Sequence, residues 1–276
     1  MKAWVPSHIT GFFAAKRQDD PQKSGSIGCG LALALGATTT IETSPKTEIV
    51  LNGQVSEAPV SRYVVDRLAR SPVRVKTELD MPLGAGFGAS GAGALGCAYA
   101  LNAHFDLGLT ANQAAAVAHV AEVTNRTGLG DVIGQNTGGL VMRLKPGAPG
   151  IGQVDRIPVP PLVVDYVVRG PISTKEVLSD QAMMKAVNTA GEAALKDLLK
   201  RPTLRDFMLL SRRFTVQAGL ASDWALDAIE AVEAAGGMAS MIMLGDGIFA
   251  FGGHPALSSF GEVHTTSISQ RGANLD

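Results

Sequence analysis

A glycine-rich stretch over residues 81–96 has the composition of a loop that binds a polyphosphate. It holds six glycines and no charged residue. Apolar and polar residues alternate over 73–79, which predicts a half-buried strand before it, and the Ala- and Leu-rich segment 92–105 predicts a helix after it. A glycine loop between a strand and a helix directs free backbone N–H groups and the positive end of the helix dipole toward one point.

Two well-known phosphate loops do not fit this stretch. The P-loop ends in Gly-Lys-Ser or Gly-Lys-Thr, and the stretch contains no lysine. The dinucleotide-binding fingerprint needs a third glycine at a fixed spacing and an acidic residue about 20 positions later, where this chain is expected to continue as a helix. Two alternatives remain: another kind of phosphate loop, or a glycine-rich turn that only allows tight helix packing.

Two carboxylates follow in the next part of the chain, nine residues apart. Thr110 and Gln113 form a capping box that begins a helix, and Glu122 lies near the end of that helix. Asp131 lies in a glycine-rich segment over 125–139, which is expected to be a loop. Alone, a Glu on an Ala-rich helix is typical of a solvated face, and an Asp in a glycine loop is typical of a turn.

A histidine and an arginine accompany the two carboxylates. His119 is three residues before Glu122, so both are expected on one face of the helix. Arg143 follows Asp131 by twelve residues, on the apolar segment 140–144 that predicts a strand. Its guanidinium could bind a substrate carboxylate through two parallel hydrogen bonds, with an ordinary surface arginine as the alternative.

The composition is that of a globular enzyme. The chain has 276 residues, a formal net charge of −1 and no basic run, which argues against nucleic acid as a partner. No apolar stretch is long enough to span a membrane, and no signal peptide is evident. The two cysteines, Cys29 and Cys97, lie in apolar surroundings, so we expect buried thiols in a reducing cytoplasm rather than a disulfide or a zinc site.

The elements that must position these residues follow from periodicity and turn signals. Segment 31–35 alternates Leu and Ala and favours neither strand nor helix. Before the glycine loop we otherwise expect a strand over 2–5, a turn over 6–13, a surface loop over 18–23, a strand over 36–42, a hairpin turn at Asn52-Gly53 and a helix over 59–70.

A linker-like segment over 145–150 and a second proline-marked break over 158–161 suggest two domains, 1–157 and 158–276. After the break we expect a strand over 161–168, a short helix over 175–178, three helices over 181–200, 203–217 and 223–235, and two strands within 236–251.

The run Pro-Leu-Gly-Ala-Gly-Phe-Gly-Ala-Ser-Gly-Ala over 82–92 resembles the second motif of the GHMP kinases, whose usual form is Pro-x-x-x-Gly-Leu-Gly-Ser-Ser-Ala-Ala. Phe87 stands in place of Leu and Ala89 in place of the first Ser, whereas Ser90 keeps the second Ser. Segments 6–13 and 236–251 resemble the first and third motifs of the same superfamily.

Within the superfamily, the chain resembles most closely the pantoate kinases of archaea. The resemblance rests on Pro-Ser-His-Ile-Thr-Gly-Phe-Phe over 6–13, Thr-Gly-Leu-Gly-Asp-Val over 127–132 and Pro-Ile-Ser-Thr over 171–174. It implies an α+β, two-domain GHMP kinase fold, with an N-terminal domain like ribosomal protein S5 domain 2 and a ferredoxin-like C-terminal domain.

The resemblance also implies roles for individual residues. Asp131 is expected to orient or deprotonate the 4-hydroxyl of pantoate, and Ser90 and Glu122 to hold the Mg²⁺ of ATP. The residues expected to bind ATP are Pro82, Gly84, Gly86, Gly88, Ala89, Ser90 and Gly91. The residues expected to bind pantoate are His8, Ser26, His119, Arg143 and Thr174.

The function expected from this resemblance is ATP-dependent phosphorylation of (R)-pantoate to 4-phosphopantoate in archaeal coenzyme A biosynthesis, in the cytoplasm. Alternatives are a GHMP kinase of the shikimate or mevalonate type, or a nucleotide-binding regulator without catalysis. The sequence leaves the oligomeric state open, with a homodimer as one candidate.

Overall fold

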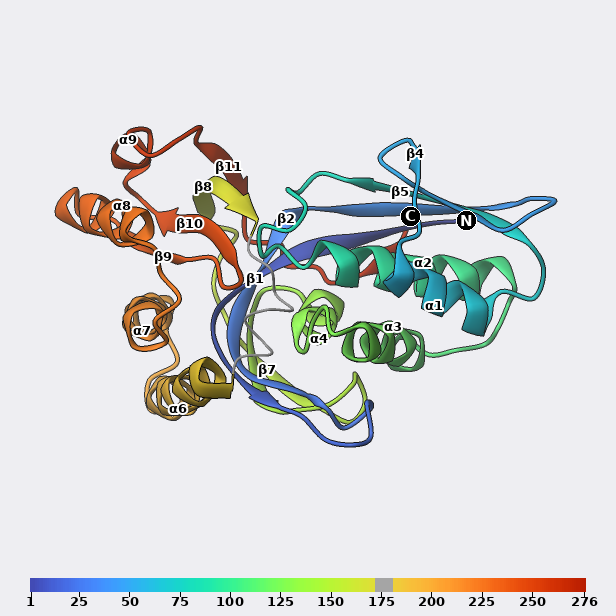
Figure 1. Ribbon diagram of the computed structural model, residues 1–276, viewed down its shortest axis with the longest axis horizontal. Helices are drawn as coiled ribbons and strands as arrows, with labels where there is room; N and C mark the ends of the chain where they lie inside the picture. The colour runs from blue at the N-terminus through green and yellow to red at the C-terminus, as the bar shows by residue number, and fades with distance from the viewer. Residues whose placement is uncertain (172–180) are drawn as a thin grey trace.

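The computed structural model describes residues 1–171 and 181–276 and contains two β-sheets (Figure 1). The larger sheet has the strand order β12-β1-β2-β5-β3-β4, with β6 and β7 continuing from β2. The smaller sheet has the order β11-β8-β10-β9. Neighbouring strands are antiparallel except β3 and β5. Helices α1 to α4 cover one face of the larger sheet, α7 and α8 pack on the smaller one, and α6 packs on β1 and on α7.

The elements associated with the larger sheet are β1 (Lys2–Lys16), β2 (Gly25–Thr43), β3 (Glu48–Leu51), β4 (Gln54–Val55), α1 (Pro59–Leu68), β5 (Val73–Leu79), α2 (Ala89–His104), α3 (Ala111–Asn125), α4 (Asp131–Thr137), β6 (Leu140–Lys145), β7 (Gln153–Ile157) and β12 (Asn274–Leu275). Those associated with the smaller sheet are β8 (Val163–Pro171), α6 (Gln181–Leu198), α7 (Leu204–Gln217), α8 (Asp223–Ala234), β9 (Met238–Met241), β10 (Gly245–Phe251), α9 (His254–Leu257) and β11 (His264–Ser267). The short helix expected over 175–178 falls outside the described residues.

The first strand is much longer than the sequence predicts. We expected a strand over 2–5 followed by a turn over 6–13, but β1 continues through both segments to Lys16. Its register shifts between Pro6 and Ser7 and again before Phe12, so the strand absorbs the proline and the Gly11 region as β-bulges. Long pairing with β2 also decides the ambiguous segment 31–35, which is strand.

Several local signals do form the expected structures. Asn52 and Gly53 have φ angles of 46° and 79°, which the hairpin turn between β3 and β4 requires. Thr110 accepts a hydrogen bond from the Gln113 backbone and the Gln113 side chain bonds back to Thr110, so the capping box begins α3 as predicted. The strand over 73–79 is β5.

The far half of β1 joins the two sheets into one body. Phe12 lies 6.2 Å from Phe207 and 6.4 Å from Phe214 between ring centroids, which places α7 against the strand. An added Cβ on Gly191 would be 1.9 Å from the Phe13 carbonyl oxygen, so α6 approaches the same strand with backbone against backbone. The site described below lies on this shared strand.

The split into 1–157 and 158–276 stays a prediction. Strand β7 of the larger sheet ends at Ile157, and β8 of the smaller sheet begins at Val163. The end of the chain nevertheless returns to the larger sheet, where Leu275 pairs with Ala3 of β1. A division by sheets would therefore count this last strand with the first domain.

Cys29 and Cys97 are buried free thiols, as expected. Burial raises the pKa of each thiol to about 12, so both stay protonated and pack as small apolar groups.

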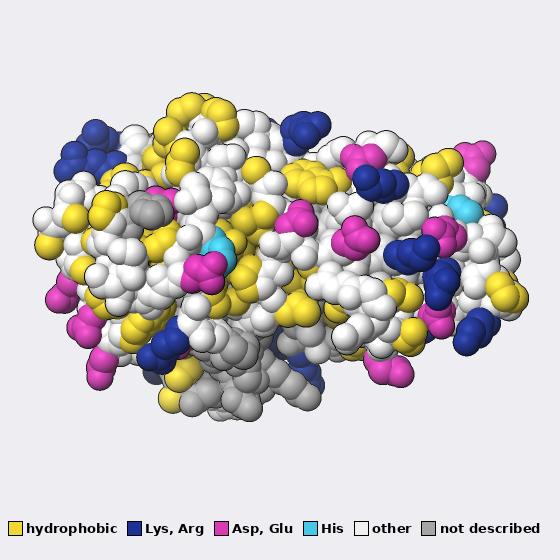
Figure 2. Space-filling view, turned by 90° about the horizontal axis from the view of Figure 1, so that it is seen from above, with side chains coloured by type: hydrophobic (Ala, Val, Ile, Leu, Met, Phe, Trp, Pro, Cys, Tyr) yellow, Lys and Arg dark blue, Asp and Glu magenta, His cyan; other side chains and the backbone are white. Residues whose placement is uncertain are grey.

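On the face shown in Figure 2, Lys and Arg side chains are interspersed with Asp and Glu side chains, in keeping with the formal net charge of −1. Among the helices in the described part of the chain, none combines the length and apolarity needed to cross a membrane.

Candidate active site

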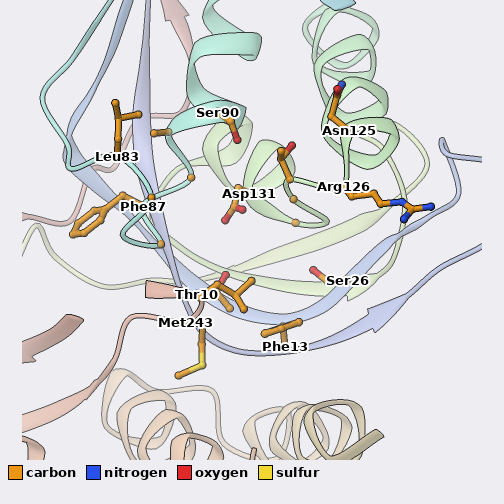
Figure 3. A pocket seen from close by; sticks show the side chains of 18 of the residues that line it. Thr10, Phe13, Ser26, Leu83, Phe87, Ser90, Asn125, Arg126, Asp131 and Met243 are labelled. Carbon is orange, nitrogen blue, oxygen red and sulfur yellow. The ribbon is translucent and has the colours of Figure 1, made fainter. Parts of the chain in front are cut away.

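A cavity of about 390 Å³ lies where β1, the glycine loop, the segment between α3 and α4, and the β9–β10 turn meet (Figure 3). Its lining combines backbone from the loops with a few polar side chains. The lining residues are Thr10, Phe13, Ser26, Leu83, Gly84, Gly86, Phe87, Gly88, Ala89, Ser90, Asn125, Arg126, Thr127, Gly128, Gly130, Asp131, Arg143, Met243 and Leu244.

The glycine loop forms one wall of this cavity. Gly84, Gly86 and Gly88 have φ angles of 73°, 83° and 66°, values that glycine adopts without strain. Gly88 is the N-cap of α2 and supplies no capping side chain, so the first N–H groups of the helix depend on a ligand or solvent. A helix start of this kind, at a cavity lined by glycine backbone, fits an anionic phosphate chain.

Phe87 anchors the loop instead of contacting a ligand with its ring. The ring is 1% exposed and packs edge-on against Tyr166 of β8, with 5.0 Å between ring centroids. Figure 3 shows the side chain directed away from the cavity. The Phe87 carbonyl accepts a hydrogen bond of 3.0 Å from the His8 backbone N–H, so the loop is attached to both sheets.

Gln135 is a second anchor, which sequence reasoning did not identify. It is fully buried on α4, and its Nε2 donates a hydrogen bond of 2.8 Å to the Gly88 carbonyl. An added Cβ on Gly88 would lie 2.8 Å from the same nitrogen. The glutamine therefore fixes the N-cap of α2 from behind, and only glycine fits between them.

Glu122 does not line the cavity itself but lies directly behind two residues that do, Ser90 and Thr127. The Ser90 and Thr127 hydroxyls each donate a hydrogen bond of 2.6 Å to its Oε1. Burial raises the pKa of Glu122 to about 7, the two hydroxyl bonds act in the opposite direction, and the charge of Asp131 raises it further. This carboxylate is held where a nearby positive charge would stabilise its ionised form.

The Ser90–Glu122 pair fits the chemistry of Mg²⁺. A hydroxyl and a carboxylate are the hard oxygen ligands that this cation prefers. In residues 1–171 and 181–276 there is no cluster of three His, Cys, Asp or Glu side chains able to hold a metal. The donor set is therefore that of a cation bound jointly by few protein oxygens and by phosphate oxygens, rather than that of a closed protein site.

Asp131 is the first residue of α4, not a residue of an irregular loop as we expected. Its side chain is 24% exposed and lines the cavity, and its Oδ1 lies 2.9 Å from His8 Nδ1. An added Cβ on Gly128 would lie 2.1 Å from Glu122 Oε2 and 3.4 Å from the other aspartate oxygen, Oδ2, so that glycine leaves room chiefly beside Glu122. Asp131 can thus present a fixed oxygen acceptor to a hydroxyl in the cavity.

Arg143 is a buried cation on the Asp131 side of the cavity, where His8 contacts both residues. Its side chain is 1% exposed, and its guanidinium donates long hydrogen bonds of 3.4 Å to Thr10 Oγ1 and 3.5 Å to His8 Nε2. Within residues 1–171 and 181–276, its Nε has no hydrogen-bond partner. Burial lowers the pKa of Arg143, which shows that the charge is poorly solvated. An anionic group bound in the cavity would supply the missing interaction.

Ser26 is also placed at this end of the cavity. It is 5% exposed, and an added Cβ on Gly130 would lie 2.3 Å from its Oγ and 2.7 Å from Arg143 Nε. Gly130 therefore leaves space that a side chain would fill, next to both the hydroxyl and the cation. Ser26 and Arg143, far apart in sequence, line the same part of the cavity.

Other predicted site residues lie elsewhere. His119 is buried outside the cavity, where its Nε2 lies 2.8 Å from the Ser24 carbonyl oxygen, and burial lowers its pKa. His8 lies behind Asp131 and does not line the cavity. Pro82 and Gly91 are not among the lining residues. Thr174 lies outside the described residues.

The structure adds lining residues that sequence reasoning missed. Thr10 belongs to the segment 6–13 that we had expected to be a turn, and Thr127 to the Thr-Gly-Leu-Gly-Asp run, so signals for these two existed. Met243 and Leu244 lie in segment 236–251, which resembles the third motif, but were not singled out. They reach the cavity because the turn before β10 packs on the glycine loop, where an added Cβ on Gly86 would lie 2.7 Å from the Met243 carbonyl oxygen.

The comparisons with known proteins agree with this geometry. Residues 58–139 match the model of the GHMP kinases N terminal domain. The chain is 40% identical to the pantoate kinase of Thermococcus kodakarensis, over 91% of this chain and 87% of that protein. It is 33% identical to the pantoate kinase of Methanospirillum hungatei, over 98% and 94% of the two chains.

A solved structure described as a phosphotransferase related to the CoA biosynthesis pathway superposes with a TM-score of 0.90 at 34% identity, covering 100% of this chain and 98% of that one. The expected α+β GHMP kinase fold is thereby confirmed. With relatives of this identity and coverage, the chain belongs to the pantoate kinase family of the GHMP kinase superfamily.

Proposed function

We propose that this protein transfers the terminal phosphoryl group of ATP to the 4-hydroxyl of (R)-pantoate, giving 4-phosphopantoate for coenzyme A synthesis. Relatives at 33–40% identity over most of the chain are pantoate kinases. Pantoate carries a hydroxyl to be phosphorylated and a carboxylate to be recognised. The site offers a partner for each of these two groups.

One observation carries this proposal: a single cavity joins a glycine loop to a buried cation. The loop is on one wall, and Asp131 and Arg143 line the same space. Arg143 is 1% exposed, and its Nε lacks a hydrogen-bond partner in the part of the chain that the structure describes. Burying a cation without an anionic partner destabilises a protein. An anionic ligand that pairs with the guanidinium is therefore the best explanation for this arginine.

The ATP side of the reaction would depend on backbone and on two oxygen ligands. The N–H groups at the start of α2 would bind the phosphates, while Ser90 and Glu122 would hold Mg²⁺. Bound Mg²⁺ neutralises the charge of the transferring phosphoryl group. Thr127, which donates to the same Glu122 oxygen as Ser90, keeps the carboxylate oriented.

The acceptor side would depend on Asp131, Arg143 and Ser26. Phosphoryl transfer passes through a loose transition state, so the protein mainly positions the nucleophile and stabilises charge. The Asp131 carboxylate accepts the hydrogen bond of the 4-hydroxyl and takes its proton as the new P–O bond forms and the bond from the γ-phosphorus to the ADP oxygen breaks, releasing ADP. Arg143 pairs with the pantoate carboxylate, and the Ser26 hydroxyl bonds to the same substrate.

The two buried free thiols are compatible with a reducing compartment, and we propose that the enzyme works in the cytoplasm. A homodimer remains a proposal that sedimentation or light scattering would test.

A substrate panel tests the function directly. Purified protein is mixed with ATP and Mg²⁺ and with pantoate, shikimate or mevalonate, and ADP formation is followed by a coupled assay. We expect turnover with pantoate to exceed turnover with the other two by at least about tenfold. Arg143 and Asp131 are fixed in the site, so they select a substrate by the distance between its carboxylate and its reacting hydroxyl. Faster turnover of shikimate or mevalonate would reject pantoate as the substrate. Tight ATP binding without ADP formation from any of the three would favour a regulator.

A further inference from the structure

His8 is placed in a slot that fits an imidazole ring and little else. It lies on β1 with no exposed surface. An added Cβ on Gly30 of β2 or on Gly134 of α4 would lie 2.6 Å from His8 Nε2. Two glycines from different elements therefore make room for this ring, and a side chain at either position would displace it.

The neighbours of the ring fix which nitrogen carries the proton. Nδ1 lies 2.9 Å from Asp131 Oδ1, and Nε2 lies 3.5 Å from Arg143 Nη1. A guanidinium has only donors, so Nε2 must accept and be unprotonated. A neutral ring then carries its proton on Nδ1, and this N–H donates a hydrogen bond to the aspartate. Burial also lowers the pKa of His8, which favours this neutral form.

A purely structural role for His8 explains these contacts poorly. An apolar ring of similar size would fill the slot without the free-energy cost of burying two polar nitrogens. Both nitrogens instead face the two charged groups that line the cavity, Asp131 and Arg143. The remaining oxygen, Asp131 Oδ2, stays available because the histidine engages only Oδ1.

We propose that His8 is a positioning residue: as the neutral Nδ1–H tautomer, it fixes the Asp131 carboxylate for the attacking hydroxyl and links it to Arg143. The inference rests on the proposed function of Asp131 and Arg143. His8 is then not a substrate ligand, as the sequence suggested, but acts through the aspartate. The acceptor at Nε2 also keeps the Arg143 guanidinium in place. One ring therefore orients both Asp131, which binds the hydroxyl of the substrate, and Arg143, which binds its carboxylate.

Two amide substitutions separate the two nitrogens. The amide nitrogen of Asn is as many bonds from Cα as Nδ1, so His8→Asn can keep the donor to Asp131. In His8→Gln the amide group reaches the Nε2 position and the Nδ1 donor is lost. A hydrogen bond to a charged group contributes a factor of about 10–100. We expect kcat to fall by that factor in His8→Gln and by less than about fivefold in His8→Asn, with the KM for ATP unchanged in both.

The expected split in kcat is a result that general loss of packing would not produce. Equal kcat in His8→Asn and His8→Gln, whether both fall or both stay at the wild-type value, would overturn the proposal. His104→Asn and His104→Gln, on the half-buried last turn of α2, are matched controls that should leave kcat unchanged. Wild-type turnover of pantoate is measured first, so failure of the proposed function is seen separately.

Spectroscopy tests the tautomer without substrate and without a variant that must be active. Long-range ¹H–¹⁵N spectra of the wild-type protein distinguish the Nδ1–H, Nε2–H and doubly protonated rings, and the His8 signals are identified by their loss in His8→Asn. We expect the Nδ1–H form at neutral pH. An Nε2–H or a doubly protonated His8 would overturn the proposal even if both variants are inactive.

Discussion

The two carboxylates of the site, Glu122 and Asp131, lie in different surroundings: Asp131 lines the cavity, whereas Glu122 lies behind the lining residues Ser90 and Thr127. Glu122 is 2% exposed, and two hydroxyls donate to one of its oxygens. The Asp131 side chain is 24% exposed and has an imidazole as its partner. Burial raises the pKa of Glu122 to about 7, whereas the more open Asp131 faces the space where a substrate would lie.

This difference explains how one site can hold two carboxylates with different roles, a metal ligand and a base. A deeply buried carboxylate is costly to ionise until a cation arrives, which suits a metal ligand. A carboxylate that is partly exposed and held by a neutral donor can interact with a hydroxyl directly, which suits a base. The predictions for Asp131 and Glu122 would fail if the two residues had interchangeable roles or none, and those for Arg143 and His119 test the groups around them.

The largest effect is expected for Asp131→Asn. The amide keeps the shape of the side chain but cannot take a proton, so kcat should fall by about 10²–10⁴. The low end is compatible with a loose transition state, which needs little deprotonation. ATP affinity, measured by calorimetry, should change by less than about threefold, and the melting temperature should change little because the side chain is partly exposed.

Asp66→Asn, on the exposed side of α1, serves as the control for that change and should keep wild-type kcat. Full kcat in Asp131→Asn would show that the base is another group. Unfolding of the variant would show that Asp131 mainly starts α4, the turn-forming role that a lone Asp in a glycine-rich segment has.

A smaller effect is expected for Arg143→Ala, which removes the cation on the Asp131 side of the cavity. The KM for pantoate should rise at least about tenfold, since a charge-assisted pair contributes roughly 1.5–3 kcal/mol. The KM for ATP should change much less. Arg143→Met fills more of the space left by the arginine, so it should raise the KM for pantoate in the same way without leaving a packing void.

Arg201→Ala provides a matched loss of charge at an arginine whose side chain is 79% exposed, and both KM values should stay unchanged. Equal increases in the two KM values of Arg143→Ala would mean that the residue serves the phosphates or the fold, and the comparison of the two sides of the cavity would break down.

The third effect is on stability and concerns Glu122→Gln. The pKa of Glu122 is about 7 in the folded protein and 4.5 ordinarily, so the folded state binds a proton more tightly than the unfolded chain. Wild-type stability should therefore fall as pH rises from about 4.5 to about 7 and stay lower above that range. The glutamine of the variant does not titrate. Without Mg²⁺, the free energy of unfolding of the variant should therefore gain on that of the wild type as pH rises through this range, by on the order of 1–3 kcal/mol.

Thermal melting of both proteins at pH 5 and pH 8 measures this difference, and added Mg²⁺ with ATP should reduce it by stabilising the wild type alone. The same variant should lose most turnover at limiting Mg²⁺. A pH-independent difference in melting temperature, or wild-type turnover of the folded variant, would remove the distinction between Glu122 and Asp131.

The smallest effect on activity is expected for His119→Gln. His119 shares a helix with Glu122 but bonds to the Ser24 carbonyl outside the cavity. The KM for pantoate should change by less than about threefold, and loss of the buried bond should cost about 1–3 kcal/mol in stability, measured by urea denaturation. A large increase in this KM alone would restore the sequence-based assignment of His119 to substrate binding.

Local sequence signals predicted those parts of the protein that depend on neighbouring residues. The glycine loop, the Thr110 capping box and the Asn52-Gly53 turn form as expected because backbone freedom and capping act within a few residues. Glu122 and Asp131 were identified by their resemblance to a family, since each residue alone is typical of a surface or a turn.

Tertiary structure decided what joins distant segments. The strand β1 runs through a proline because pairing with β2 outweighs the local turn signal. His8, Asp131 and Arg143, on β1, α4 and β6, meet only when those elements pack together. No spacing along the chain shows that His8 is buried behind an aspartate or that His119 bonds to the Ser24 carbonyl. Burial and side-chain partners come from the whole fold, so only the structure shows the surroundings of these two histidines.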